Sequence, residues 1–386
     1  MARSDTPPQL DHGFDQVALA LQGGGALGAY QAGAYAALFE RGVLPDWVAG
    51  VSIGAINAAL IAGNAPADRL QAMDDFWHRI TRFMPGQFAL PGLPVAPALA
   101  NWLTAGRNLM FGQPAFFEPR LPPPLFWPED REEALSFYDI SPLRETLLQY
   151  VDFERLNNGP VRLSVGAVDI HDGNYVYFDN RERTIGPEHI MASGALPPGF
   201  PPVEVEGRWY WDGGLASNTP LDFILHHHPR PDTLIFQIDL WPARGEFPRN
   251  IVDVAERAKE IQFSSRTRLN STQAVREMRL KRQVRELLDR LDPDAPDVAA
   301  LVEALEQDCA GGVATIVHLI YQARPYEHDS KDYNFSRRMM EEHWASGASD
   351  VARVFRIPDL LERPSAEAGV RVVASDRVAA AGLSQT

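Results

Sequence analysis

The stretch GVSIGAINAA, residues 50–59, places Ser52 between Gly50 and Gly54 in a G-x-S-x-G pattern. The apolar run WVAGV (47–51) leads into this serine, and a segment of small residues follows it. A strand, a strained turn that carries the serine and a helix together form a nucleophile elbow. Glycines suit such a turn because a Cβ would clash where backbone packs against backbone. A serine hydroxyl becomes a good nucleophile only when a base takes its proton, so the pattern predicts a base elsewhere in the chain.

The composition is typical of a folded protein and argues against a nucleic-acid partner. The chain has 386 residues, of which 45% are hydrophobic and 23% charged, and its formal net charge is −15. Nucleic-acid binding through bulk charge requires the opposite sign. The single cysteine, Cys309, excludes an intramolecular disulfide.

The expected location is the cytoplasm. Residues 1–15 form a polar leader that we expect to be disordered, and they contain no apolar core of signal-peptide length. No apolar run approaches the roughly 18–20 residues that are needed to span a bilayer. A peripheral membrane contact and a homo-oligomer both remain open.

Short apolar runs predict buried strands, and longer periodic segments predict helices. The predicted strands cover 16–22, 46–51, 161–170, 174–180, 233–240 and 314–322, and the predicted helices include 29–42, 67–83, 136–151 and 331–345. After about residue 250 the chain consists mainly of long, charged helical segments. Residues 255–290 carry ten Lys and Arg against five Asp and Glu, and we expect a solvated helical face there rather than a lipid-binding one.

Residues 85–128 differ from everything around them. They hold ten prolines and seven aromatic side chains but only three charged ones. Prolines prevent regular sheet pairing, and long irregular loops in compact domains are often lids or binding loops. The insertion is therefore either a lid or acyl-chain site, or a structural cover or dimer contact. Its aromatic residues include Trp102, Phe111, Phe116, Phe117, Phe126 and Trp127.

A glycine-rich segment, GGGALG (23–28), follows the first strand and precedes the first helix. It satisfies the G-x-G-x-x-G pattern of a dinucleotide site. Such a site also needs an acidic residue at the end of the next strand, whereas Asp46 stands before that strand and Ser52 after it. An oxyanion hole fits better, because consecutive glycines let backbone N–H groups point at one spot beside a helix N-terminus. A glycine-rich packing turn is the third alternative.

The base that Ser52 needs is not an obvious histidine. His78 and His318 lie inside a predicted helix and a predicted strand, and HHH (226–228) marks a helix end. His189 has no evident acid partner. Asp212, in WYWDGG, closes a short strand before two glycines, where a tight turn would let it approach a serine directly. A turn-capping aspartate is the alternative.

Three motifs taken together resemble those of the patatin-like phospholipases. They are GGGALGAY (23–30), GVSIG (50–54) and DGG (212–214), which occur in this order between residue 16 and about residue 240. The proline-rich segment just before DGG strengthens the resemblance. The resemblance implies a three-layer α/β/α fold with a mostly parallel central sheet, a glycine-rich oxyanion loop, and a Ser-Asp dyad without histidine.

By this resemblance, Ser52 is the nucleophile, Asp212 is its base, and neither a metal nor an organic cofactor is needed. The groups implied around the oxyanion are Gly23, Gly24, Gly25 and the N–H of Ile53. The remaining motif glycines are Gly28, Gly50, Gly54, Gly213 and Gly214.

The resemblance also implies a catalytic domain over 16–245 and a mostly helical extension over 246–386. The segment ARPYEHDSKDYNFSRRMMEEHW (323–344) is similar to an uncharacterised C-terminal extension of some bacterial patatin-like proteins. One departure is Leu27, which stands where the family's glycine loop usually carries Arg or Lys. This difference puts phospholipid specificity in question but leaves ester hydrolysis intact.

The expected activity is therefore that of a lipid acyl hydrolase, which cleaves carboxylic esters by acyl transfer through Ser52. A general carboxylesterase or thioesterase that acts on non-lipid esters is one alternative. A non-catalytic lipid-binding protein of the same fold is another.

Overall fold

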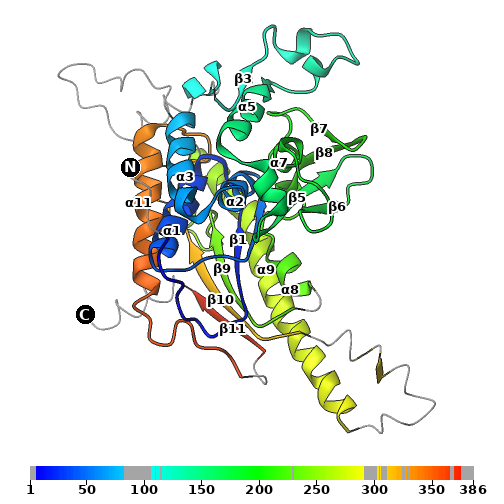
Figure 1. Cartoon of the computed structure of the whole chain (residues 1–386). Helices are drawn as coiled ribbons and strands as arrows, with labels where there is room; N and C mark the ends of the chain where they lie inside the picture. The colour runs from blue at the N-terminus through cyan, green and yellow to red at the C-terminus, as the bar shows by residue number, and fades with distance from the viewer. Residues whose placement is uncertain are drawn as a thin grey trace, which may run out of the picture.

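Strand β1 (Gln16–Leu21) lies inside a nine-stranded sheet that runs through the computed structural model of the chain (Figure 1). The strand order is β11-β10-β9-β1-β2-β5-β8-β7, and β6 also pairs with β5. The pairs from β11 to β5 are parallel, whereas β6, β7 and β8 are antiparallel to their neighbours. The other strands of this sheet are β2 (Trp47–Val51), β5 (Arg162–Asp169), β6 (Tyr175–Asp179), β7 (Val203–Val205), β8 (Arg208–Asp212), β9 (Thr233–Asp239), β10 (Ala314–Ile320) and β11 (Val370–Ala374).

The structure describes residues 6–81, 106–108, 110–113, 115–227, 230–290, 302–303, 305, 311–323, 327, 331–365 and 369–374. For 265–272, 274, 275 and 278 it describes the backbone only. Cys309 and Trp102, both named above from the sequence, lie outside these residues.

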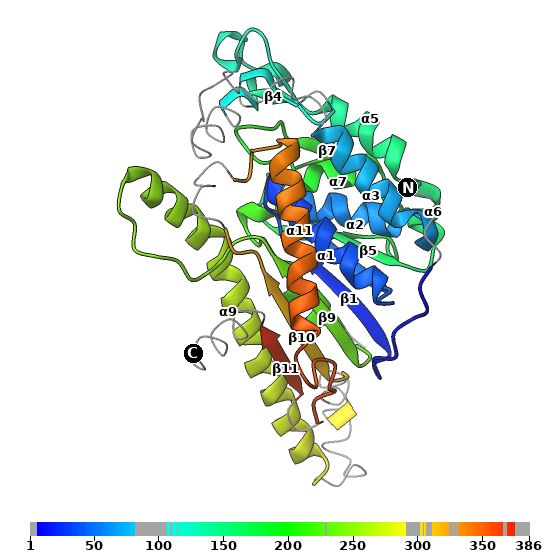
Figure 2. The ribbon, with the colours of Figure 1, turned by 90° about the vertical axis from the view of Figure 1, so that its left-hand side faces the viewer.

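Helices cover both faces of the sheet, so the mixed, mostly parallel sheet with flanking helices matches the predicted fold class (Figures 1 and 2). Side chains alternate between the faces of a strand: Val17, Leu19 and Leu21 of β1 belong to one apolar cluster, and Ala18 and Ala20 belong to the other. The helices are α1 (Gly28–Glu40), α2 (Ile53–Ala62), α3 (Pro66–Ile80), α5 (Ser141–Tyr150), α6 (Phe153–Asn158), α7 (Pro187–Ser193), α8 (Leu221–His226), α9 (Ile251–Leu288) and α11 (Arg337–Val354).

The C-terminal part of the chain is helical, as expected, but it also extends the central sheet. Strand β10 pairs with β9 in parallel, and β11 pairs with β10. Helix α11 lies alongside α1 (Figure 2). Their backbones touch, because a Cβ on Gly33 would lie 1.9 Å from the carbonyl oxygen of Trp344. Residues beyond 246 therefore share a sheet and a core with the N-terminal part.

Part of the leader that we expected to be disordered is attached to this core. Residues 6–15 contain no helix or strand and lead into β1. The Leu10 amide nevertheless donates to the carbonyl of Gly42 at 2.9 Å. Phe14 is buried in the main apolar cluster. Residues 1–5 lie outside the described residues.

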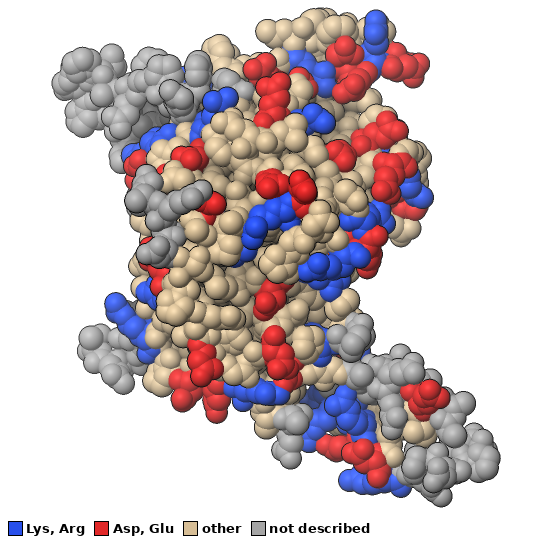
Figure 3. Space-filling model, viewed as in Figure 1, with Lys and Arg blue, Asp and Glu red and all other residues tan. Residues whose placement is uncertain are grey.

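The basic segment 255–290 lies in α9 as far as Leu288, and the distal end of this helix projects from the body of the protein (Figure 1). Ion pairs link Lys281 to Glu277 and Arg282 to Glu286 one turn apart. Figure 3 shows Lys and Arg interspersed with Asp and Glu on this projecting end. Mixed charge of this kind is what a solvated helical face presents.

The described part of the insertion, from residue 106 onward, has a buried base and an exposed tip. Phe116 and Phe117 are buried, with ring centroids 5.7 Å from Phe335 and 5.4 Å from Phe200, respectively. A short hairpin of β3 (Glu118–Pro119) and β4 (Tyr138–Asp139) then carries the chain outward. The exposed apolar side chains of the insertion and the hairpin tip are Met110, Phe111, Leu121, Leu125, Phe126, Leu135 and Phe137. Phe116 and Phe117 are thus part of the core. Burial at these two positions is what we expect of a structural cover.

Candidate active site

Ser52 occupies the strained turn between β2 and α2. Its φ is 55° and its ψ is −124°, a conformation that a residue with a side chain rarely adopts and that is common at functional sites. The neighbouring glycines allow the turn to pack closely. A Cβ on Gly50 would lie 2.3 Å from the carbonyl oxygen of Gly54, and a Cβ on Gly54 would lie 2.3 Å from that of Leu21.

Ser193, the last residue of α7, fixes the backbone of this turn. Its hydroxyl accepts the Ser52 amide at 3.0 Å and donates to the carbonyl of Gly166 in β5 at 2.6 Å. Ser193 is fully buried. Sequence reasoning missed this residue, because a serine at the end of a short helix carries no local signal for a contact with the elbow.

The register of the sheet brings Asp212 to Ser52. Strand β5 lies between β2 and β8, with Val51 paired to Gly166 on one side and Asp212 paired to Ala167 on the other. The residues that end β2 and β8 therefore meet at the same level of β5. The Ser52 hydroxyl lies near enough to the Asp212 carboxylate to lower the pKa of that carboxyl group.

Asp212 is buried, and its carboxylate has few partners. Its Oδ1 accepts the Gly214 amide at 2.7 Å, as the N-cap of the short 3-10 turn Gly213–Leu215. Burial raises the pKa of Asp212 to about 6, and the interactions with the Gly214 amide and the Ser52 hydroxyl offset part of that rise. Gly213 has no room for a side chain, since a Cβ there would lie 2.6 Å from the carbonyl oxygen of Gly166.

Gly23 packs against Ser52, but its amide already has an acceptor. A Cβ on Gly23 would lie 3.1 Å from the Cβ of Ser52. Its N–H donates to the carbonyl of Asn218 at 3.2 Å. Its carbonyl accepts the Asn218 side chain at 3.0 Å and the Trp241 indole at 2.9 Å. The peptide of Gly23 is thus fixed on both sides, and its N–H is not available to a ligand.

The amides of Gly24, Gly25 and Ile53 remain available. Within the described part of the chain, none of these three N–H groups donates to a protein acceptor. Gly25 has φ 55°, a left-handed conformation that favours glycine, and it opens the 3-10 turn Gly25–Leu27 before α1. Gly28 lets α1 meet the start of α2, because a Cβ there would lie 2.4 Å from the side chain of Ile53.

A glutamine that no sequence motif marked holds the loop to two other segments. The side chain of Gln22 accepts the amides of Leu240 and Trp241 at 2.6 and 3.0 Å, and it donates to the hydroxyl of Thr219 at 3.0 Å. These contacts join the ends of β1 and β9 to the segment that follows DGG. Gln22, Asn218 and Trp241 surround the loop only after folding, since they are far apart in the sequence.

The histidines make other contacts. His189 accepts the Gly186 amide at 3.0 Å within the first turn of α7, and burial lowers its pKa. His318 pairs with Asp239, and His226 pairs with Glu277. None of these contacts includes Ser52 or Asp212. Among the described residues, no three His, Cys, Asp or Glu side chains gather as a metal site requires.

The fold and the site define an α/β protein that carries a serine on a strand-to-helix turn beside a buried aspartate. A family model described as patatin-like phospholipase matches residues 19–225, more than half of the chain, and the chain belongs to this family. A second family model, described as patatin phospholipase, matches residues 261–367. The predicted family and its C-terminal extension are thus confirmed, and membership supports hydrolysis of lipid esters.

The solved structures that are similar to this chain include the following two. The crystal structure of VipD from Legionella pneumophila has 14% sequence identity and a TM-score of 0.34, with 90% of this chain and 72% of that chain covered. Full-length ExoU of the Pseudomonas aeruginosa type III secretion system, solved in complex with full-length SpcU, has 20% identity and a TM-score of 0.27, with 69% of this chain and 52% of that chain covered. No curated protein matches the sequence. In the portion of the chain that the structure describes, no helix has the length and apolar character to cross a membrane.

Proposed function

We propose that this protein is a lipid acyl hydrolase that cleaves carboxylic esters of phospholipids, lysophospholipids or related lipids, with Ser52 as the nucleophile and Asp212 as its base. The observation that carries the proposal is that the Ser52 hydroxyl interacts with the buried Asp212 carboxylate next to the glycine loop. Membership of a phospholipase family supports lipid esters as the substrate class.

Acylation starts with transfer of the Ser52 proton to Asp212 while Oγ attacks the ester carbonyl carbon. The carbonyl oxygen becomes an oxyanion, which receives hydrogen bonds from the free amides of Gly24, Gly25 and Ile53. The C–O bond to the alcohol then breaks. The proton on Asp212 passes to the leaving alkoxide, which departs as an alcohol, and the acyl group stays on Ser52.

Deacylation repeats these steps with water. Asp212 takes a proton from water, the resulting hydroxide attacks the acyl carbon, and the same amides receive the second oxyanion. The bond to Ser52 breaks, and the proton on Asp212 returns to Oγ. The products are a carboxylic acid and the restored enzyme.

The environment of Asp212 suits this role. A free carboxyl group is a weak base, whereas burial raises the pKa of Asp212 to about 6. A base works best when its pKa lies near the working pH, because it is then ionised and still binds a proton well. At neutral pH the Asp212 carboxylate is mostly ionised and ready to accept the serine proton.

The glycine loop offers no cation to a phosphate headgroup. Leu27, at the position where the family usually has Arg or Lys, is fully buried in the core. Any preference for a headgroup must therefore come from other side chains. Ester hydrolysis itself depends only on the serine, the aspartate and the backbone amides.

A fluorophosphonate probe and a substrate panel test the proposal. We expect the wild-type protein to be labelled and to hydrolyse nitrophenyl esters, lysophospholipids and diacyl phospholipids. Ser52→Ala should remove labelling and lower kcat by about 10⁶-fold, as nucleophile loss does in other serine hydrolases. The matched control is Ser141→Ala, since Ser141 is an exposed serine at the start of α5.

The outcomes separate the alternatives. No labelling and no hydrolysis by the folded wild type would favour a non-catalytic lipid-binding protein. Hydrolysis of short esters alone would favour a general carboxylesterase or thioesterase. A Ser52→Ala variant that retains a tenth of wild-type activity would remove Ser52 from the mechanism.

A further inference from the structure

The C-terminal extension touches the glycine loop directly. The carbonyl oxygen of Asp332 accepts the Ala26 amide at 2.7 Å. The same oxygen packs against the Cα of Gly25, since a Cβ there would lie 2.2 Å from it. Asp332 therefore contacts Gly25 and Ala26, the two residues that follow Gly24 in the loop.

The loop is thus held from two sides. On the domain side, Asn218 and Trp241 fix the peptide of Gly23. On the extension side, Asp332 fixes Ala26. The two free amides, those of Gly24 and Gly25, lie between these anchors. Donors that are fixed before the reaction stabilise an oxyanion without any cost of reorganisation.

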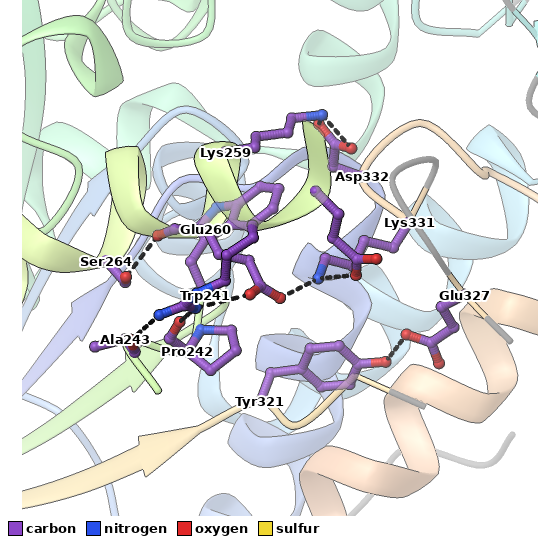
Figure 4. Close-up of polar contacts among 12 residues, drawn as sticks. Trp241, Pro242, Ala243, Lys259, Glu260, Ser264, Tyr321, Glu327, Lys331 and Asp332 are labelled. Carbon is purple, nitrogen blue, oxygen red and sulfur yellow. Dashed lines mark hydrogen bonds and ion pairs between the residues drawn. The ribbon is translucent and has the colours of Figure 1, made fainter. Parts of the chain in front are cut away.

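Helix α9 holds Asp332 in place through charge (Figure 4). The Lys259 ammonium binds both oxygens of the Asp332 carboxylate, at 2.7 and 2.6 Å. It also lies 4.4 Å from the ring centroid of Tyr333. Because Lys259 is only 23% exposed, this pair is less screened by solvent than a fully exposed one.

The residue before Asp332 is anchored more deeply. The Lys331 side chain is 1% exposed, and its ammonium binds Glu256 at 2.9 Å and Glu260 at 2.7 Å (Figure 4). Arg257 binds Glu260 from the other side at 2.9 Å and donates to the carbonyl of Ala243. The backbone of 331–332 is therefore fixed by two consecutive side chains, both tied to α9.

This cluster is not itself an anion site. Its three cations, Lys259, Lys331 and Arg257, are each paired with a carboxylate of the same cluster. A phosphate headgroup would have to displace an existing ion pair. The contacts instead point inward, to the backbone of the glycine loop.

We infer that Asp332 is a positioning residue, which sets the geometry of the oxyanion loop through its carbonyl and is itself oriented by Lys259. The inference rests on the proposed function, because it assigns the amides of Gly24 and Gly25 to the oxyanion. It gives the extension a part in catalysis: the catalytic domain supplies the reacting groups, and the extension completes the loop that stabilises the charge.

Lys259→Met tests the inference, because it removes the charge that orients Asp332 and keeps most of the side-chain volume. We expect kcat for nitrophenyl butyrate to fall about 10- to 100-fold, since small misplacements away from the reacting atoms have effects of this size. KM should stay within about twofold, and labelling by a fluorophosphonate should slow in parallel, because its phosphoryl oxygen uses the same amides. Lys259→Arg should restore most of the activity.

The matched control is Lys281→Met, on the same helix. Lys281 has a similar exposure, 26%, and pairs with Glu277 at 3.3 Å far from the loop. Its kcat should equal that of the wild type, with activity expressed per folded protein from circular dichroism. A purely structural role of Lys259 would lower Tm but leave kcat of the folded protein unchanged.

Several results would overturn the inference while leaving the proposed function intact. They are a wild-type kcat in folded Lys259→Met, a fall no larger than that of Lys281→Met, or a change in KM alone. If Lys259→Met does not fold, Asp332→Asn replaces it, and a wild-type kcat in that variant overturns the inference. An inactive, unlabelled wild type would instead overturn the proposed function and the inference with it.

Discussion

Ser52 and Asp212 interact across the end of β5, although 159 residues separate them in the sequence. The pairing of Val51 with Gly166 and of Asp212 with Ala167 places both side chains at the same level of the sheet. Because the aspartate is buried at this point, its ionisation controls both the proposed chemistry and part of the stability.

The first prediction concerns the pH dependence of activity. With the pKa of Asp212 raised to about 6, kcat/KM should be constant above pH 7 and should fall about tenfold per pH unit well below pH 6, as the base becomes protonated. A pH profile with a nitrophenyl ester measures this. A fall in kcat/KM centred near pH 4 would show that the base is an ordinary exposed carboxyl group.

The second prediction concerns stability. In the unfolded chain the Asp212 carboxyl has the ordinary aspartate pKa of 3.8, whereas burial raises its pKa in the folded protein to about 6. Between these values the folded state binds more protons than the unfolded state, so the free energy of unfolding falls as pH rises through this window, by about 3 kcal/mol at most. Asp212→Asn should be inactive and yet more stable than the wild type at pH 8.

Urea unfolding at pH 5 and pH 8 checks this second prediction. The difference in stability between Asp212→Asn and the wild type should shrink at pH 5, where the wild-type carboxyl is largely protonated. An active Asp212→Asn, or one that is equally destabilised at both pH values, contradicts the assignment of this residue.

The third prediction concerns the glycine loop. Gly25→Ala introduces a Cβ in a left-handed conformation and 2.2 Å from the carbonyl oxygen of Asp332, so the loop must move. We expect kcat to fall by roughly 10²-fold or more, as on loss of an oxyanion donor. Gly207→Ala is the control: its φ is +80°, but nothing lies within 4 Å of the added Cβ. Equal kcat for the two variants would show that the loop tolerates movement.

The fourth prediction concerns Ser193, which fixes the backbone of the elbow. Ser193→Ala leaves the Ser52 amide and the Gly166 carbonyl without this buried partner, at a cost of about 1–3 kcal/mol. We also expect a lower kcat, because the elbow loses the contact that orients Ser52. Thermal unfolding and kinetics together measure this. A stable variant with normal kcat would mean that water replaces the hydroxyl.

The fifth prediction concerns the exposed tip of the insertion. Phe116 and Phe117 belong to the insertion that the sequence suggests as a lid, but both are buried, so their replacement by Ser should impair folding. Phe111, Leu125 and Phe126 are each exposed, and exposed apolar side chains are suited to contact a lipid aggregate. Changing all three to Ser should raise KM for long-chain esters and spare acetate esters.

Phe247→Ser is the control for this surface, because Phe247 is 90% exposed and lies outside the insertion. Equal effects of the triple variant on long and short esters would favour a cover without a role in substrate binding. A Phe247→Ser variant with the same rise in KM would show that exposed apolar area in general, rather than the insertion, determines binding.

Much of this protein could be predicted locally. The elbow at Ser52, the turn at Asp212 and the glycine loop each depend on backbone conformations and close approaches that glycine permits, and glycine is visible in the sequence. Apolar runs likewise marked β1, β2, β5, β9 and β10. Strand β11 was missed, and the predicted role of Gly23 as an oxyanion donor does not agree with its hydrogen bond to Asn218. The partner of a main-chain amide cannot be identified from the sequence around it.

The sequence by itself determined the family, the strand-to-helix turn and the residue types that the proposed chemistry needs, because these follow from short-range sterics and motif order. Only the tertiary structure decided which groups meet. The register on both sides of β5 brings Asp212 to Ser52. The contact between Asp332 and the glycine loop is made through a main-chain carbonyl. Every residue carries such a group, so no pattern of side chains in the sequence could predict this contact.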